Sequence, residues 1–316
     1  MKKSAFNIAA IDIGSNGARL LIKRFDENAR VEEERNKRVM FIRVPLRLGK
    51  DVFTLGRISK EREYKMVHML KGFKEFMKLN DVKAYRACAT SAMRDAENGC
   101  KILKRVSKKT GIHLEIIPGE EEARLLCNDF MEVAALRSSG QLAETDASET
   151  SNFVYMDVGG GSTEVSLIHD GALIDSCSFN IGTLRLLGGK VTRDIKLRFE
   201  NEMKSFASKF SDICILGSGG NINKLYKLIK PKNDHYELPV SDLKQMYDVL
   251  KPMSIEERIR TFHLKDDRAD VIVPAAEIFL KASECLHSKS ILVPNISLAD
   301  SIIDGLYRND LGSELK

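Results

Sequence analysis

One pattern occurs twice in this chain, and it constrains the fold more than any other feature. Residues 12–22 (DIGSNGARLLI) align without a gap on residues 157–167 (DVGGGSTEVSL). Each stretch follows an apolar strand and reads as Asp-apolar-Gly, a turn of small residues and a second apolar strand. The repeat predicts two duplicated halves that each begin with a β-hairpin. Two such domains would face each other across a cleft, a common place for a ligand.

The rest of the chain fits a two-domain α/β protein. A length of 316 residues is too long for one ordinary core. Strands alternate with helices after each hairpin, which predicts a mixed sheet flanked by helices in each half. Residues 138–152 are small and polar, as in a linker. We therefore expect an N-terminal domain over 1–137 and a C-terminal domain over 153–316, whose last helix could pack back on the N-terminal domain.

Local patterns place several elements of the N-terminal half. Residues 6–26 predict the first hairpin, with its turn at SNG. Apolar side chains recur about every 3.6 residues in 59–79, which predicts a helix with Ser59 as its N-cap. Further helices are expected over 97–109 and 120–136.

Composition excludes several classes of protein. The 50 basic and 45 acidic residues leave a formal net charge of +5, which suits an anionic ligand. No basic block is interleaved with aromatic residues, so we expect no nucleic-acid partner. No stretch approaches 18 apolar residues, so we expect no membrane span. The apolar run at the start is interrupted by Asn7 and Asp12 and reads as a strand, and the six cysteines lack metal-knuckle spacing; both favour a reducing cytoplasm.

The two hairpin turns carry the first candidate chemistry. Turns of Gly, Ser and Asn let backbone N–H groups converge on phosphate oxygens. The aspartates at the strand ends, Asp12 and Asp157, are candidate ligands for a divalent cation. Hairpins also use such residues for geometry alone. The run Gly159–Gly161 is the stronger signal, because three consecutive glycines are costly to order.

A third glycine cluster follows the strand at 215–216. The residues Gly217, Ser218 and Gly219 precede a helix whose free N–H groups could receive an anion. Strand–helix turns often contain glycine without any such role.

Acidic and basic side chains supply further candidates. The carboxylates of Glu120, Glu121 and Glu122 open a helix, where they suit the helix dipole. A general base acting on water is the functional alternative. Arg94 follows a strand that ends in small residues and hydroxyls, and it could clamp a phosphate or simply pair on the surface. The same two interpretations apply to Arg185.

The order of these motifs resembles one known family. DIGSN, RLG, ATSAMRDAEN, IIPGEEEAR, DVGGGSTE, IGTLRL and GSGGN occur in the order seen in exopolyphosphatases and guanosine pentaphosphate phosphohydrolases, the Ppx/GppA family. The resemblance covers about residues 6 to 306. It implies an actin-like (ribonuclease H-like) fold of two duplicated domains, with the active site in the interdomain cleft.

The resemblance also implies roles for particular residues. Glu122 matches the catalytic base, Asp157 the aspartate that positions metal or water, and Glu164 a second acidic residue. Arg94 matches an arginine that contacts phosphate. The phosphate loops correspond to Ser15, Asn16, Gly159, Gly160, Gly161 and Ser162. The implied cofactor is Mg²⁺ or Mn²⁺, and the implied assembly is a homodimer.

The expected reaction is release of terminal phosphate from inorganic polyphosphate by water. Guanosine pentaphosphate is the alternative substrate. Alternatives of another class are an actin-like kinase, or a sensor that binds polyphosphate or nucleotide without turnover. The chain resembles the short form of the family, which has no extra C-terminal helical domain.

Several positions depart from the family pattern. Gly17 stands where Ser or Thr is common, and Asn221 where Thr is usual. Ala275 and Ala276 replace common glycines, and Ile303 replaces a frequent Arg. These departures bear on chain-length preference and on the level of activity.

Overall fold

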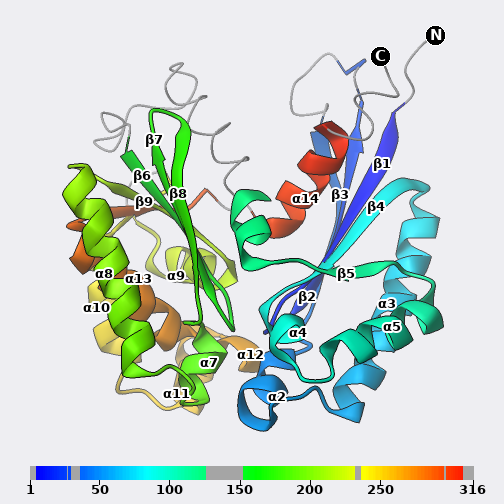
Figure 1. Cartoon of the computed structure of the whole chain (residues 1–316), viewed down its shortest axis with the longest axis horizontal. Helices are drawn as coiled ribbons and strands as arrows, with labels where there is room; N and C mark the ends of the chain where they lie inside the picture. Colours follow the sequence, from blue (N-terminus) through cyan, green and yellow to red (C-terminus); the bar gives the residue numbers. More distant parts are fainter. Residues whose placement is uncertain are drawn as a thin grey trace. The chain divides into compact units, whose positions relative to one another are not determined.

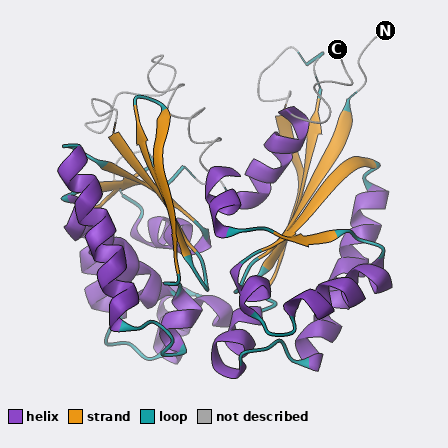
Figure 2. Ribbon diagram, viewed as in Figure 1, coloured by secondary structure: helices purple, strands orange, loops and turns teal. Residues whose placement is uncertain are grey.

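The computed structural model describes residues 5–26, 28–29, 36–125, 152–231, 236–294 and 297–308. Their contacts divide the chain into two compact units (Figures 1 and 2). Unit 1 comprises Met1–Pro118 and Leu298–Lys316, and unit 2 comprises Gly119–Ser297. Of the predicted linker, only Asn152 lies within the described residues, so the expected domain boundaries stay a prediction.

Unit 1 contains a five-stranded mixed sheet in the order β3-β2-β1-β4-β5. Strands β1, β2 and β3 pair in antiparallel fashion, whereas β4 and β5 extend the sheet in parallel to β1. The strands are β1 (Phe6–Ile13), β2 (Ala18–Phe25), β3 (Asn36–Val44), β4 (Val82–Ala89) and β5 (Leu114–Ile116). The predicted hairpin over 6–26 is therefore confirmed.

Helices cover both faces of this sheet, with α3 and α5 on one face and α14 on the other (Figure 1). They are α2 (Leu48–Leu55), α3 (Lys60–Leu79), α4 (Ser91–Asp95), α5 (Gly99–Thr110) and α14 (Leu298–Leu306). The Ser59 side chain accepts a hydrogen bond from the backbone of Arg62, which confirms the predicted N-cap of α3. Helix α5 ends at Gly111, whose φ of 70° is a backbone conformation that favours glycine.

Unit 2 contains a six-stranded mixed sheet in the order β10-β11-β9-β6-β7-β8. Its strands are β6 (Asn152–Val158), β7 (Thr163–His169), β8 (Ala172–Phe179), β9 (Cys214–Ser218), β10 (Glu237–Pro239) and β11 (Ser290–Leu292). Its helices are α7 (Thr183–Leu187), α8 (Arg193–Lys209), α9 (Gly220–Ile229), α10 (Val240–Leu250), α11 (Ile255–Phe262), α12 (Asp266–Ala269) and α13 (Ile272–Leu286). Residues 119–125 are also helical, and the rest of the helix predicted over 120–136 lies outside the described residues.

The two sheets repeat one topology. Strands β8-β7-β6-β9-β11 of unit 2 follow the same order and directions as β3-β2-β1-β4-β5 of unit 1. This agreement confirms the duplicated α/β architecture that the repeated motif predicted.

Alternate side chains of β6 face opposite sides of the sheet of unit 2. Val154, Met156 and Val158 of β6 face the large apolar cluster formed with helices such as α8 and α13. Successive side chains of a strand point to opposite faces, so Tyr155 and Asp157 face the other side of the sheet. The face of the sheet opposite this apolar cluster therefore carries the candidate site.

Candidate active site

Three carboxylates predicted from the sequence meet in unit 2. Oxygen atoms of Glu122, Asp157 and Glu164 all lie within 4.8 Å of one another. Asp157 near the end of β6 and Glu164 on β7 are direct partners in the antiparallel register, and Glu122 comes from the helical residues 119–125. Glu122 and Glu164 are only 6% and 1% exposed. Asp157 is half-buried. Segments that are far apart in the sequence thus form one acidic group.

Two hydroxyl groups donate hydrogen bonds to the Glu164 carboxylate. Ser162 Oγ donates a hydrogen bond of 2.6 Å to Glu164 Oε1, and Ser178 Oγ donates one of 3.1 Å to the same atom. Donors to a carboxylate stabilise its charge, whereas neighbouring carboxylates repel it. A hard divalent cation, which prefers oxygen ligands, would relieve that repulsion. The donor set therefore fits Mg²⁺ or Mn²⁺.

A buried phenol lies next to this acidic group. Tyr155 is fully buried and precedes Asp157 by two residues on the same face of β6. Burial raises the pKa of Tyr155 well above its usual value, and the carboxylates of Asp157, Glu164 and Glu122 add to the shift. The side chain therefore remains a neutral phenol and adds no further negative charge to the group.

Helix α7 orients the turn of three glycines. The carbonyls of Gly159 and Gly160 accept hydrogen bonds from the backbone N–H groups of α7, and Gly161 O accepts one of 2.6 Å from Arg185 Nε. In a planar trans peptide the N–H points opposite to the C=O. The N–H groups of Gly160, Gly161 and Ser162 therefore point away from α7, as donors for an anion must.

Gly182 makes this arrangement possible. A Cβ atom at residue 182 would lie 2.5 Å from backbone atoms of Gly160 and Gly161. The absence of a side chain lets α7 approach the turn closely. The motif IGTLRL is therefore part of the candidate site because it supports the turn from behind.

The third glycine cluster also borders the acidic group. Gly219 has a φ of 100°, and a Cβ atom there would lie 2.6 Å from Asp157 Oδ1. The last strand residue, Ser218, pairs with Asp157 in the register of β6 and β9. A Cβ atom at Gly217 would lie 2.8 Å from the Ile291 side chain, so that glycine serves packing.

Sequence reasoning missed Arg268. Its NH1 atom donates a 2.7 Å hydrogen bond to Asn221 Oδ1, across 47 positions of sequence. Its guanidinium also lies against Gly220, where a Cβ atom would be 2.3 Å from Arg268 NH2. Arg268 therefore brings a cation to the start of α9, beside the acidic group. No local pattern marks this residue, because only the fold brings α12 to α9.

In unit 1 the predicted phosphate ligands gather where parallel strands end. The hydroxyls of Ser15 and Ser91 are 2.7 Å apart, and Asn16 O accepts a hydrogen bond from Arg47 N. Arg94 NH1 donates to Ile117 O at 2.8 Å, in the segment just before the helical residues 119–125. Arg94 thus fixes the backbone that leads to Glu122, a contact that its predicted phosphate role did not include.

Asp12 has a different environment from Asp157. It is 2% exposed and forms an ion pair with Arg19, its partner in the hairpin register. Arg19 occupies the position that Glu164 takes in unit 2. Among the described residues, the group of three or more potential metal donors consists of Glu122, Asp157 and Glu164, without Asp12. A metal role for Asp12 stays a prediction, and its charge is already balanced.

The residues that depart from the family pattern fit closely into their surroundings. A Cβ atom at Gly17 would lie 3.1 Å from Val44 O and 3.2 Å from Arg43 NH2, so the turn is tight there. Ala275, Ala276 and Ile303 are fully buried. Asn221 accepts the hydrogen bond from Arg268 described above.

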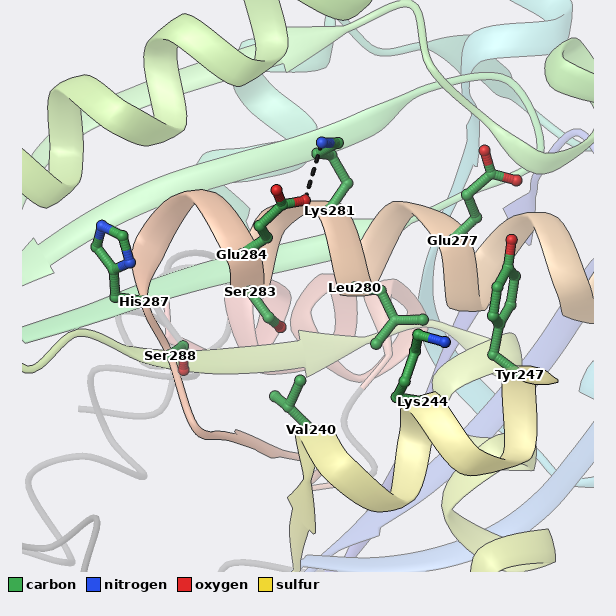
Figure 3. A pocket seen from close by; sticks show the side chains of 10 residues that line it. All are labelled: Val240, Lys244, Tyr247, Glu277, Leu280, Lys281, Ser283, Glu284, His287 and Ser288. Carbon is green, nitrogen blue, oxygen red and sulfur yellow. Dashed lines mark hydrogen bonds and ion pairs between the residues drawn. The ribbon is translucent and has the colours of Figure 1, made fainter.

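A groove between α10 and α13 lies apart from this chemistry (Figure 3). Lys281 and Glu284 on its edge form a 2.9 Å ion pair, and Lys244 and His287 also line the groove. Helix α13 packs on the apolar face of the sheet, whereas Asp157 lies on the opposite face.

Among the described helices, none is both long and apolar enough to cross a membrane.

The duplicated mixed sheets and the paired glycine turns define a protein of the actin-like fold. Within that class the assignment is specific. The Ppx/GppA phosphatase family model matches residues 29–309, so this chain belongs to that family.

Curated relatives agree with the family. A bifunctional 3-dehydroquinate synthase/phosphatase of Fusobacterium nucleatum is 29% identical over 58% of this chain and 26% of its own length. Exopolyphosphatase 1 of Mycobacterium bovis is 31% identical over 50% of this chain and 41% of its own length. The match thus covers about a quarter of the length of the first relative and about two fifths of the length of the second. Exopolyphosphatase 2 of Mycobacterium tuberculosis is 25% identical over 95% of this chain and 97% of its own.

Solved structures show the same fold. A crystal structure of the Aquifex aeolicus member of the Ppx/GppA family superposes with a TM-score of 0.70 and 25% identity, covering 97% of this chain and 99% of that one. An exopolyphosphatase structure from Cytophaga hutchinsonii has a TM-score of 0.77 at 22% identity, over 96% and 98% of the two chains.

Proposed function

We propose that this protein is a divalent-metal-dependent phosphohydrolase that releases terminal phosphate from inorganic polyphosphate. The observation that carries the proposal is the acidic group of Glu122, Asp157 and Glu164 beside a glycine turn whose N–H groups point away from α7. Membership of the Ppx/GppA phosphatase family supports the reaction class. Relatives named exopolyphosphatase support the choice of polyphosphate.

The three carboxylates have different roles in this proposal. Asp157 and Glu164 would hold the cation, because they are fixed on neighbouring strands and two hydroxyl donors orient the Glu164 carboxylate. The bound cation would balance the charge of the phosphate oxygens. Glu122 would orient a water molecule and accept its proton. The water oxygen bonds to the terminal phosphorus, the bridging P–O bond breaks, and the shortened chain leaves with the bridging oxygen.

Backbone donors would stabilise the transferred group. The N–H groups of Gly160, Gly161 and Ser162 are held in place by α7 before any ligand binds. Preorganised donors of this kind need no rearrangement as charge develops. Arg268 adds a cation at the start of α9. We retain Ser15, Asn16 and Arg94 as proposed phosphate ligands.

The test is phosphate release by the purified chain with Mg²⁺ or Mn²⁺. Polyphosphate, guanosine pentaphosphate and ATP would be compared as substrates. Glu122→Gln should lower kcat on the order of 10²–10⁴-fold, because it removes the general base. Glu120→Gln is the matched control, since Glu120 is exposed in the same helical turn and lies outside the acidic group. Full activity of Glu122→Gln would exclude the proposed role. Faster phosphate release from guanosine pentaphosphate than from polyphosphate would make guanosine pentaphosphate the preferred substrate. Transfer of phosphate only to an acceptor molecule would indicate a kinase.

A further inference from the structure

Helix α5 carries an unusual concentration of charge. It contains the five cations Lys101, Lys104, Arg105, Lys108 and Lys109 and no acidic residue. This charge equals the formal net charge of +5 of the whole chain. At 3.6 residues per turn the five side chains fall within an arc of about 140° and extend over about 12 Å. All five are exposed, so α5 presents one cationic stripe to solvent.

Helix stability does not account for this stripe. Like charges four residues apart, such as Lys101 and Arg105, destabilise a helix by about 0.2–0.5 kcal/mol per pair. Lys108 and Lys109 in the last turn suit the helix dipole, whereas Lys101 lies near the positive end, where a cation is unfavourable. The stripe is therefore maintained against a small cost in local stability.

The four lysines of α5 lack the pairing seen on α3. Lys65 pairs with Glu61 on α3, and Lys78 pairs with Glu75. On α5, Arg105 bonds to Glu63 through two nitrogen atoms, at 2.8 and 2.6 Å. In the part of the chain that the structure describes, the four lysines of α5 form no ion pair. Their charges are available to an external anion.

A groove of about 680 Å³ runs between α3 and α5 beside the stripe. Its cationic lining includes Lys60, Lys71, Arg105 and Lys109. Its one carboxylate, Glu63, is held by Arg105, and this hydrogen bond lowers the pKa of Glu63. The groove therefore extends the positive surface of α5 rather than balancing it.

The stripe begins next to the element that carries Arg94. A Cβ atom at Gly99, the first residue of α5, would lie 2.1 Å from Met93 O on α4, and Gly99 N donates to Ala96 O. Lys101 thus follows closely on the segment that holds Arg94. From there the stripe leads away along α5.

We propose that the cationic stripe of α5, with the adjoining groove of α3, is a second binding surface for linear polyphosphate that holds long chains. The identity of the polyanion rests on the proposed function, and the charge pattern stands on its own. A closely spaced row of phosphates matches a row of cations along one helix. Single-stranded nucleic acid is bound by aromatic platforms on which successive bases stack. Helix α5 has no aromatic residue, and the groove offers only the neighbouring rings of Tyr64 and His68 on α3, so no row of platforms follows the stripe.

The test compares two triple variants that remove the same charge. The stripe variant is Lys101→Gln, Lys104→Gln and Lys108→Gln. The control is Lys65→Gln, Lys78→Gln and Lys83→Gln, three exposed lysines of unit 1 off the stripe. Both are made in Glu122→Gln protein, and binding of labelled long-chain polyphosphate and of tripolyphosphate is measured against salt. A third variant with Arg at the three stripe positions restores the charge, and thermal unfolding checks the fold of all three.

The stripe variant should bind long chains about tenfold more weakly, and the slope of log K against log salt should fall by about one per lysine removed. Tripolyphosphate binding should be unchanged, and the Arg variant and the control should bind like the parent protein. Unchanged long-chain affinity in a folded stripe variant would overturn the inference, as would tighter stripe-dependent binding of single-stranded RNA. The proposed function can fail independently of this inference. A protein that binds polyphosphate through the stripe but, with Glu122 intact, releases no phosphate would support the second binding surface and contradict the proposed phosphohydrolase activity.

Discussion

Asp157 and Glu164 lie directly opposite each other on β6 and β7, and together with Glu122 they bring three carboxylates within 4.8 Å. The equivalent partners in unit 1 are Asp12 and Arg19, which form an ion pair. The same hairpin thus serves two electrostatic purposes. At this register position unit 2 has Glu164 and unit 1 has Arg19, so Asp157 belongs to an acidic group whereas Asp12 pairs with a cation.

This relationship predicts where metal binds. Asp157→Asn should weaken Mn²⁺ binding by at least about tenfold, because it removes a candidate ligand. Asp12→Asn should leave Mn²⁺ affinity unchanged while lowering stability, because it removes the ion pair between Asp12 and Arg19. Isothermal titration calorimetry measures both affinities. If Asp12→Asn weakens Mn²⁺ binding as much as Asp157→Asn, the metal site includes the first hairpin.

Gly182 should be intolerant of a side chain. Gly182→Ala would place a methyl group 2.5 Å from the backbone of Gly160 and Gly161, so the glycine turn must move. We expect a loss of about 1–3 kcal/mol in the free energy of unfolding, together with reduced phosphate release. Gly72→Ala on α3 is the matched control, since no atom lies within 4 Å of its added methyl group. Urea unfolding measures the stability of both variants. If Gly182→Ala is as stable as Gly72→Ala, the close approach of α7 to the glycine turn is contradicted.

Arg268 should contribute to phosphate binding. Arg268→Lys keeps the charge but loses the planar guanidinium that lies on Gly220 and bonds Asn221. We expect KM for tripolyphosphate to rise about tenfold, the equivalent of one lost charged hydrogen bond. Arg260→Lys, an exposed position on α11, should leave KM unchanged. An unaltered KM for Arg268→Lys would assign that arginine to packing alone.

Asp304 on α14 should make stability depend on pH. Burial raises the pKa of this carboxyl above its usual value, although Lys23 at 3.2 Å opposes the shift. A raised folded-state pKa means that the folded chain binds the proton more tightly than the unfolded chain. The stabilising contribution of protonated Asp304 is therefore complete below the unfolded pKa of about 3.9, and it is lost as pH rises through the folded pKa.

Asp304→Asn should remove this dependence. The difference in free energy of unfolding between the wild type and Asp304→Asn should shrink, and then reverse against the wild type, as pH rises through the acid range. Urea unfolding at a series of pH values measures that difference. A difference that grows with pH would mean that Lys23 outweighs burial.

The sequence by itself determined the local features of this protein. The small-residue turns, the Ser59 cap of α3 and the Gly111 end of α5 follow from short-range backbone geometry, and each is found in the structure. The repeated Asp-x-Gly pattern predicted the duplication, because a strand, a tight turn and a second strand are encoded by adjacent residues. The ordered motifs were sufficient to indicate the family.

Only the tertiary structure decided which side chains meet. The sequence aligned Arg19 with Glu164, but the strand register showed that one neutralises an aspartate while the other adds to an acidic group. The support from Gly182 and the cation of Arg268 were also invisible in the sequence. The physical reason is that turns and caps depend on residues a few positions apart, whereas a site depends on packing and register that join distant segments.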